Sequence, residues 1–312
     1  MFFAVCALSF SAVGAEKPLI RTRLKVGVNQ SNFVNVNRND AEAAVKTFAE
    51  TVGRRRGYVV APEIEVYDSA AEFAKGIAER GVQLAVIDCW DYLSFDLLGV
   101  MEPMFVFEEP GGPLEPYVLL TPREKGGQSL AELRGQEIVI LQNTNANLSW
   151  QWLETMLLEQ NLGALPEFFR KAEIVNKPSA AVLPVFFGQR AACVVDQSAF
   201  QLMSELNPQV GKRLRAIATS KPYLDTILCL RKEGWQSEQE KKDLIASLED
   251  LHKQPEGQQI LTVFKVSKLE PFKEELLDTV RELKATHNRL TSLAKGSANA
   301  SKPSSGHGKD LP

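Results

Sequence analysis

Histidine and long hydrophobic runs are scarce in this chain of 312 residues, and no G-x-S-x-G motif is present. The histidines, His252, His287 and His307, are far apart, and none has a cysteine or acidic neighbour at the spacing of a metal site. No lysine lies in a setting typical of a nucleophile. We therefore predict no metal, no cofactor and no enzymatic activity.

Cysteine is also rare, and the thiols lie in hydrophobic surroundings. Cys89, Cys193 and Cys229 each occur in an apolar run. Such positions favour small buried side chains, although an odd number of cysteines in an exported protein is also compatible with a free reactive thiol.

The formal net charge is −3, with 24% charged and 44% hydrophobic residues, which is typical of a globular protein with no affinity for nucleic acid.

The first 15 residues are apolar and uncharged, and they end in Val13-Gly14-Ala15. Small residues at this position suit cleavage after Ala15, so we expect residues 1–15 to be a signal peptide and the protein to be periplasmic. This segment has no positive charge, which a signal peptide normally carries. No later hydrophobic run approaches the roughly 18 residues that a membrane span needs.

Two series of alternating strands and helices predict an α/β protein with two lobes. The first series ends at the Pro- and Gly-rich stretch Glu108–Pro116, and Lys221–Asp225 is expected to be a second crossing. We assign residues 22–110 and 225–290 to lobe 1, 114–220 to lobe 2, and 292–312 to a disordered tail. Residues 270–290 are expected to be helical.

Polar loops follow several predicted strands, and parallel strands present their carboxyl ends at one edge of a sheet. These loops are Gln30–Asp40, Asp88–Tyr92, Gln142–Asn147 and Asp196–Ser198. The sequence Asn143–Asn147 lies between the predicted strand Glu137–Leu141 and a predicted helix, where backbone N–H groups and the helix dipole suit an anion. Ordinary helix capping is the alternative. We expect a ligand crevice lined by these loops.

Several segments together resemble the phosphonate- and phosphate-type substrate-binding proteins of ABC importers. Leu130–Leu162 resembles the family's region around an oxyanion-binding Ser-Thr-Ser-Gly loop, and Phe186–Met203 resembles a segment with an acidic residue at Asp196. Glu167–Ile174 and the run from Leu228 to Phe264 follow in the family's order. The resemblance implies a two-lobed type 2 periplasmic binding protein fold, with a mixed, mainly parallel sheet flanked by helices in each lobe and two hinge crossings.

The resemblance also implies a function and partners. It predicts a monomeric, non-enzymatic solute-binding protein that delivers a small oxyanion, such as a phosphonate or phosphate, to an ABC permease. A periplasmic sensor that reports its ligand to a membrane kinase has the same fold and is the alternative. The predicted ligand-binding residues lie in the loops described above: Asn143, Thr144, Asn145, Asn147, Asn32, Phe33, Trp90, Tyr92 and Asp196.

The sequence departs from the family pattern at both sides of the predicted crevice. Asn143, Thr144, Asn145 and Ala146 replace Ser-Thr-Ser-Gly, so only the threonine is kept. The segment Asp88–Tyr92 carries two carboxylates, which oppose a dianion and suit an amine, so a zwitterion such as an aminoalkylphosphonate is a further candidate. Trp90 and Tyr92 have an alternative role in the core, and Asp196 has one as a helix cap.

Overall fold

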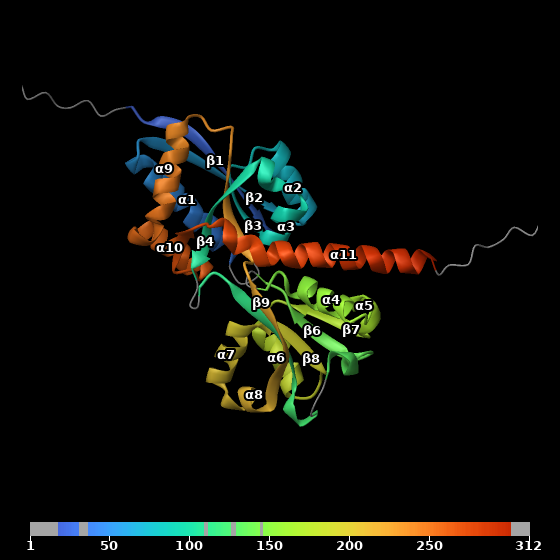
Figure 1. The fold of residues 1–312 in the computed structure, drawn as a ribbon. Coiled ribbons are helices and arrows are strands. Elements are labelled where there is room, and N and C mark those ends of the chain that lie inside the picture. Colours follow the sequence, from blue (N-terminus) through green and yellow to red (C-terminus); the bar gives the residue numbers. More distant parts are fainter. Residues whose placement is uncertain (1–17, 31–36, 109–111, 126–128, 144–145, 301–312) are drawn as a thin grey trace, which may run out of the picture.

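Two mixed β-sheets, each flanked by helices, form two lobes of the protein (Figure 1). The computed structural model describes residues 18–30, 37–108, 112–125, 129–143 and 146–300. The sheet of lobe 1 has the strand order β11-β4-β10-β3-β1-β2, and that of lobe 2 has the order β7-β6-β8-β5-β9. Both sheets contain parallel and antiparallel pairs, which confirms the predicted two-lobed fold with mixed sheets. Neither sheet is mainly parallel as predicted, because the strands next to the crossings, β10 in lobe 1 and β5 in lobe 2, pair antiparallel with both of their neighbours.

Lobe 1 is built from the first four strands and the two that follow the return crossing. Parallel pairing of β1 with β2 and β3 requires crossover connections, which α1 and α2 supply. Strand β10 runs antiparallel to β3 and β4 and joins them. The elements of lobe 1 are β1 (Ile20–Asn29), α1 (Arg38–Arg55), β2 (Tyr58–Tyr67), α2 (Ala70–Glu79), β3 (Leu84–Asp88), α3 (Cys89–Ser94), η2 (Leu97–Gly99), β4 (Met101–Glu108), β10 (Thr226–Arg231), α9 (Glu238–Glu249), η5 (Leu251–Lys253), α10 (Pro255–Phe264), β11 (Lys268–Pro271) and η6 (Glu274–Leu277).

Lobe 2 lies between the two crossings. Its strand β6, which lies between β7 and β8, is buried on both faces, as its continuous apolar run predicts: Ile138 and Ile140 are buried on one face, and Val139 and Leu141 on the other. The elements of lobe 2 are β5 (Glu115–Pro122), η3 (Arg123–Lys125), η4 (Leu130–Leu133), β6 (Glu137–Leu141), α4 (Ser149–Glu159), α5 (Leu165–Phe168), β7 (Lys171–Val175), α6 (Pro178–Phe186), β8 (Ala192–Asp196), α7 (Gln197–Leu206), α8 (Pro208–Arg213) and β9 (Leu214–Tyr223).

The C-terminal helix α11 (Asp278–Ala300) runs across the junction of the two lobes (Figure 1). It packs against α3 of lobe 1 and against α4 and β9 of lobe 2. Residues 292–300, which the sequence predicted to be disordered, are the end of this helix. Val280 and Leu283 are buried and anchor its first turns, and a helix that has been nucleated extends readily into a polar segment. Lys268–Pro271 forms strand β11, which the sequence did not predict.

Among the described residues, the cysteines Cys89, Cys193 and Cys229 are buried and free. The prediction of buried thiols is therefore confirmed. Burial raises the pKa of the Cys89 thiol well above its usual value, which keeps it protonated and unreactive.

Within the same described ranges, no helix is long and apolar enough to cross a membrane. The predicted signal peptide, residues 1–15, lies outside the described residues.

Gly257, in the first turn of α10, provides a test of the packing in lobe 1. A Cβ atom at this position would lie 1.9 Å from the carbonyl oxygen of Leu251, which is backbone and cannot rotate away. We expect Gly257→Ala to lower the free energy of unfolding by about 2–3 kcal/mol, measured by urea unfolding. Gly99→Ala is the matched control, because a Cβ there meets nothing within 4 Å, and we expect a change within about 0.5 kcal/mol. Equal urea midpoints for the two variants would contradict the close packing of Gly257 against the backbone of Leu251.

Candidate functional site

A cavity of about 660 Å³ lies between the lobes, within the size range of small-molecule sites. Both lobes contribute to it. The lobe 1 wall consists of Asn29, Asp88, Trp90 and Asp91, at the carboxyl ends of β1 and β3 and the start of α3. The lobe 2 wall consists of Gln142, Asn147, Gln151, Ile174, Val175, Asn176 and Ala180. The cavity therefore lies at the carboxyl ends of parallel strands, where α/β sheets bind ligands.

The lobe 1 wall carries two carboxylates. Asp88 ends β3 and precedes the first turn of α3, and Asp91 lies in that turn. Burial raises the pKa of Asp88 to about 7, and the neighbouring charge of Asp91 adds to this effect. Burial also raises the pKa of Asp91, while the ammonium of Lys284 opposes the increase. A cationic ligand group at this wall would stabilise the ionised form of both side chains.

The lobe 2 wall presents mainly side-chain amides, which both donate and accept hydrogen bonds. Buried residues hold the turn before α4: the Ser149 hydroxyl donates to the carbonyl oxygens of Leu141 at 2.6 Å and of Ala146 at 2.9 Å. Among the described lining residues of either wall there is no lysine, arginine or histidine. This composition opposes a free dianion and suits a ligand that carries a cationic group.

Asn147 connects the two walls directly. Its Nδ2 atom donates to Oδ1 of Asp88 at 2.9 Å, across the cavity. Its backbone N–H donates to Oδ1 of Asp225 at 2.9 Å. Asn147 thus contacts the lobe 1 wall through its side chain and the return crossing through its backbone.

Asp225 lies in that crossing, between β9 and β10, and is almost fully buried. Its carboxylate also accepts a hydrogen bond from the Tyr117 hydroxyl, whose oxygen accepts from Leu148 N–H at 3.2 Å. Its carbonyl oxygen accepts from the backbone N–H of Cys89 at 2.8 Å, at the start of α3. One buried residue therefore positions the first turn of α3 and the turn before α4, which are the two sides of the cavity. The sequence placed Asp225 in a crossing but indicated no role for it.

The predicted site residues have different locations in the structure. Trp90 and Asn147 line the cavity. Asn143 is buried beneath the lobe 2 wall, and its Nδ2 atom donates to the carbonyl oxygen of Asn176 at 3.4 Å. Asn32, Phe33, Thr144 and Asn145 lie outside the described residues, so their role stays a prediction.

Tyr92 and Asp196 do not line the cavity. Tyr92 is fully buried in the core, with its hydroxyl 3.4 Å from the carbonyl oxygen of Met101. It lies two positions after Trp90, and residues at this spacing on a helix do not share a face. Asp196 caps α7 by accepting from Ala199 N–H at 2.6 Å and from the Ser198 hydroxyl at 2.8 Å. Both residues thus have the alternative roles, core and cap, that the sequence allowed.

Helix α11 supplies a second layer behind the lobe 1 wall. The Nζ atom of Lys284 lies 4.5 Å from the centroid of the Trp90 ring and 2.6 Å from the Ser94 hydroxyl oxygen. The His287 ring meets Trp90 edge to face at 5.3 Å, and its Nε2 atom lies 2.9 Å from Oε2 of Glu154 on α4. The sequence did not indicate these residues, because a position on a C-terminal helix does not reveal which lobe the helix contacts.

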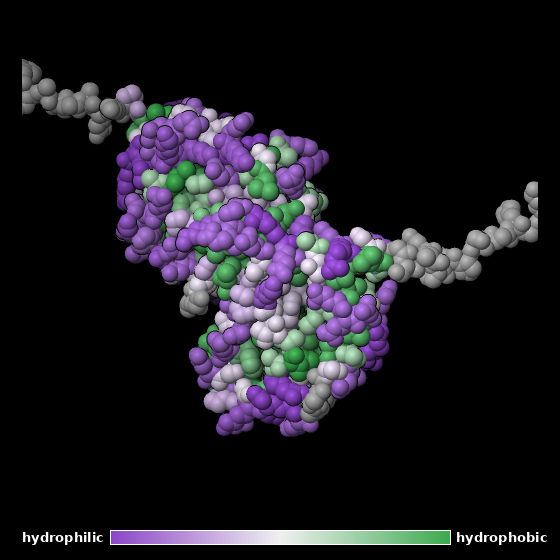
Figure 2. All heavy atoms as spheres, viewed as in Figure 1, coloured by the Kyte–Doolittle hydropathy of each residue, from purple (hydrophilic) through white to green (hydrophobic). Residues whose placement is uncertain are grey.

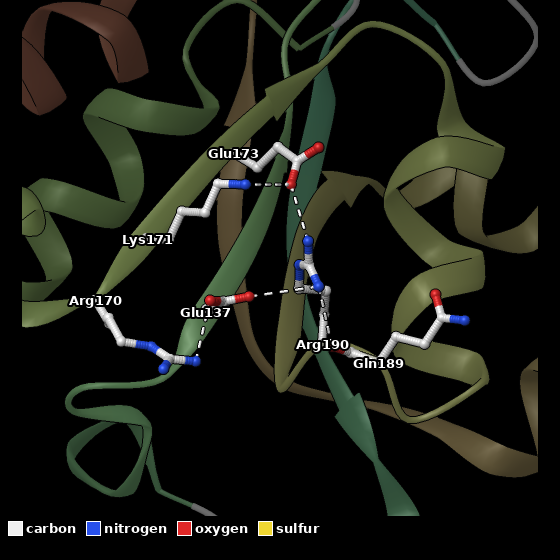
Figure 3. Close-up of polar contacts among 6 residues, drawn as sticks. All are labelled: Glu137, Arg170, Lys171, Glu173, Gln189 and Arg190. Carbon is white, nitrogen blue, oxygen red and sulfur yellow. Dashed lines mark hydrogen bonds and ion pairs between the residues drawn. The ribbon is translucent and has the colours of Figure 1, made fainter.

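A second cluster of charged residues lies at the amino ends of β6 and β7, at the far end of these strands from the cavity (Figure 3). Glu137 pairs with Arg170 at 3.0 Å, and Glu173 pairs with Lys171 at 3.2 Å and Arg190 at 3.1 Å. Every cation of this cluster has a carboxylate partner. The cluster therefore ties two strands together and is not an anion site.

Figure 2 shows that the viewed face is mainly hydrophilic, with separate hydrophobic areas on each lobe.

Comparisons with known proteins agree with this geometry. Residues 33–277 match the family described as ABC transporter, phosphonate, periplasmic substrate-binding protein. The structure of XAC2383 from Xanthomonas citri bound to ATP has a TM-score of 0.65 and 14% identity, and covers 86% of this chain and 98% of that chain. PhnD1 from Prochlorococcus marinus in complex with methylphosphonate has a TM-score of 0.58 and 14% identity, and covers 86% of this chain and 98% of that chain.

A binding protein component of an ABC phosphonate transporter from Pseudomonas aeruginosa has a TM-score of 0.57 and 14% identity, covering 92% of this chain and 100% of that chain. At this level of identity the structural matches show the fold alone, which is the two-lobed type 2 periplasmic binding protein fold. No curated protein matches the sequence.

Proposed function

Since the chain belongs to the family of periplasmic substrate-binding proteins of phosphonate ABC transporters, we propose that it binds one small solute between its lobes and delivers it to an ABC permease. The observation that supports this proposal most strongly is the cavity of about 660 Å³ with side chains from both lobes. A ligand there contacts both walls only when the lobes are closed, so binding shifts the population toward the closed form. The two chain crossings act as the hinge.

The two walls differ in chemistry, and this difference favours an aminoalkylphosphonate as the solute. The carboxylates of Asp88 and Asp91 suit its ammonium group. The amides of the lobe 2 wall, with Thr144 and Asn145 as predicted from the sequence, suit the phosphonate at the start of α4. Three or four charge-assisted hydrogen bonds of roughly 1.5–3 kcal/mol each sum to about 4.5–12 kcal/mol, a range that includes the roughly 8 kcal/mol of micromolar affinity. Inorganic phosphate lacks the cation that these carboxylates require.

A thermal-shift screen tests the proposed solute class. We expect aminoethylphosphonate to raise the melting temperature more than methylphosphonate, phosphate or sulfate, because a ligand at 100 times its Kd stabilises the folded state by about 2.7 kcal/mol. Arg170→Gln, in the exposed charged cluster far from the cavity, serves as a control that should keep the full shift. An equal or larger shift with phosphate or sulfate would contradict the proposed ammonium recognition, and no shift with any compound would contradict the solute class.

The affinity for aminoethylphosphonate should depend on pH through Asp88. The pKa of this carboxyl is raised to about 7 in the ligand-free protein, and a bound ammonium group stabilises its ionised form. Binding below this pH therefore requires the loss of a proton, so the affinity rises with pH, by about tenfold from pH ~6 to pH ~8. Isothermal titration calorimetry of the wild type and of Asp88→Asn, which removes the titration of Asp88 and keeps those of the ligand and of Asp91, measures this difference. A pH dependence that is the same in both proteins would exclude Asp88.

A further inference from the structure

The two carboxylates of the lobe 1 wall differ in their surroundings. The side chain of Asp88 accepts a hydrogen bond from Asn147 across the cavity. Asp91 lies one residue after Trp90, and Lys284 of α11 lies over the Trp90 ring and bonds to Ser94, one turn further along α3. Lys284, which lies outside the cavity lining, is therefore held against α3, where its charge opposes the rise in the pKa of Asp91; the pKa of Asp88 shows no such effect.

The other ionisable groups near this wall either form a hydrogen bond or are buried. His287, on the same helix as Lys284, pairs with Glu154 of α4 at 2.9 Å. Asp225, in the return crossing, accepts from Tyr117 and from the backbone of Asn147. The Cys89 and Cys229 thiols are buried and remain protonated. Lys284 is the cation whose charge acts on Asp91.

We propose that Lys284 determines the charge class of the solute, by balancing Asp91 from behind Trp90 and leaving Asp88 to bind a single ammonium group. This inference rests on the proposed function of the same cavity. The contacts of Lys284 with Trp90 and Ser94 hold its ammonium group in place, and burial lowers its pKa while Asp91 opposes that decrease. Arginine or lysine at this position preserves the balance. An uncharged residue leaves two unbalanced carboxylates, which suit a ligand with two cationic groups.

The ratio of two dissociation constants tests this role, because a purely structural effect would change both constants together. We would measure binding of aminoethylphosphonate and of putrescine, a diamine, to the wild type, Lys284→Met and Lys284→Arg by calorimetry. The wild type should prefer aminoethylphosphonate. Lys284→Met should shift the ratio toward putrescine by about tenfold, the effect of one partly screened charge, and Lys284→Arg should restore the wild-type ratio.

Lys295→Met is the matched control. Lys295 also lies on α11, but it is exposed and does not line the cavity. This variant should keep the wild-type ratio. The reciprocal variant Asp91→Asn leaves Lys284 unbalanced, so it should shift preference from aminoethylphosphonate toward methylphosphonate, and it provides a second test if Lys284→Met does not fold.

The outcomes separate this inference from the function on which it rests. If the wild type binds aminoethylphosphonate but both Lys284→Met and Asp91→Asn keep its ratios, the role of Lys284 is overturned and the proposed function stands. If the wild type binds none of the three compounds, the proposed solute class is overturned, and the role of Lys284 with it.

Discussion

Replacing Asp225 with alanine is expected to lower the free energy of unfolding by about 2–5 kcal/mol, because two donors of a buried hydrogen-bond network lose their acceptor. The carboxylate accepts from the hydroxyl of Tyr117, which is fully buried, and from the backbone of Asn147, which is partly buried. Each donor left without a partner costs about 1–3 kcal/mol. The backbone carbonyl of Asp225, which holds the start of α3, is kept in the variant, so the variant should loosen mainly the turn before α4 on the lobe 2 side of the cavity.

Urea unfolding followed by circular dichroism measures this effect. Asp225→Asn keeps the side-chain oxygen and the volume, and we expect it to cost about 1–2 kcal/mol. Glu233→Ala removes an exposed carboxylate in the loop after β10 and should change the stability by less than about 0.5 kcal/mol. If Asp225→Ala stays within about 1 kcal/mol of the wild type, less than the loss of even one buried hydrogen bond is expected to cost, the network does not join the lobes.

Asp88→Asn is expected to weaken the binding of aminoethylphosphonate by about 10–150-fold, the equivalent of a charge-assisted hydrogen bond of roughly 1.5–3 kcal/mol. In the ligand-free protein the same substitution should raise the free energy of unfolding or leave it unchanged. The pKa of Asp88 is raised to about 7, so the folded state holds this proton more tightly than the unfolded chain does. The stability of the wild type therefore falls as pH rises from about 4, the ordinary pKa of an aspartate, to about 7, and an uncharged asparagine avoids that loss.

The matched control for this variant is Asp196→Asn. Asp196 is also a buried acid after a β-strand, but it caps α7 and does not line the cavity. Asparagine is a good helix cap, so both stability and affinity should stay close to the wild type. Calorimetry of the two variants separates the roles. If both variants lost affinity equally, the ligand would contact Asp196 as well as Asp88 and would not lie in the proposed cavity.

The sequence predicts the order of strands and helices well, because most of them contain continuous apolar runs. Strand β6 begins and ends at the predicted residues, Glu137 and Leu141. Strand β11 was missed because it has four residues, one of them proline, and it forms only by pairing with β4. The end of α11 was missed because a polar composition does not reveal that the start of a helix is anchored by burial.

The site was predictable only in part. Loops after strands indicated Trp90, Asn147 and the carboxylates Asp88 and Asp91, because strand ends converge at one edge of a sheet. The sequence did not indicate which residue of a short helix faces the cavity, so Tyr92 was included with Trp90. It also did not reveal Asp225 and Lys284. Tyr117 is 108 positions away from Asp225, and no local spacing predicts such a pair.

The most direct test of a solute held between the lobes is a crystal structure of the protein with aminoethylphosphonate. The account predicts the ligand in the interlobe cavity, with its ammonium group within hydrogen-bond distance of Asp88 and its phosphonate oxygens toward the start of α4. A ligand that contacts one lobe only, or that lies outside this cavity, would contradict it.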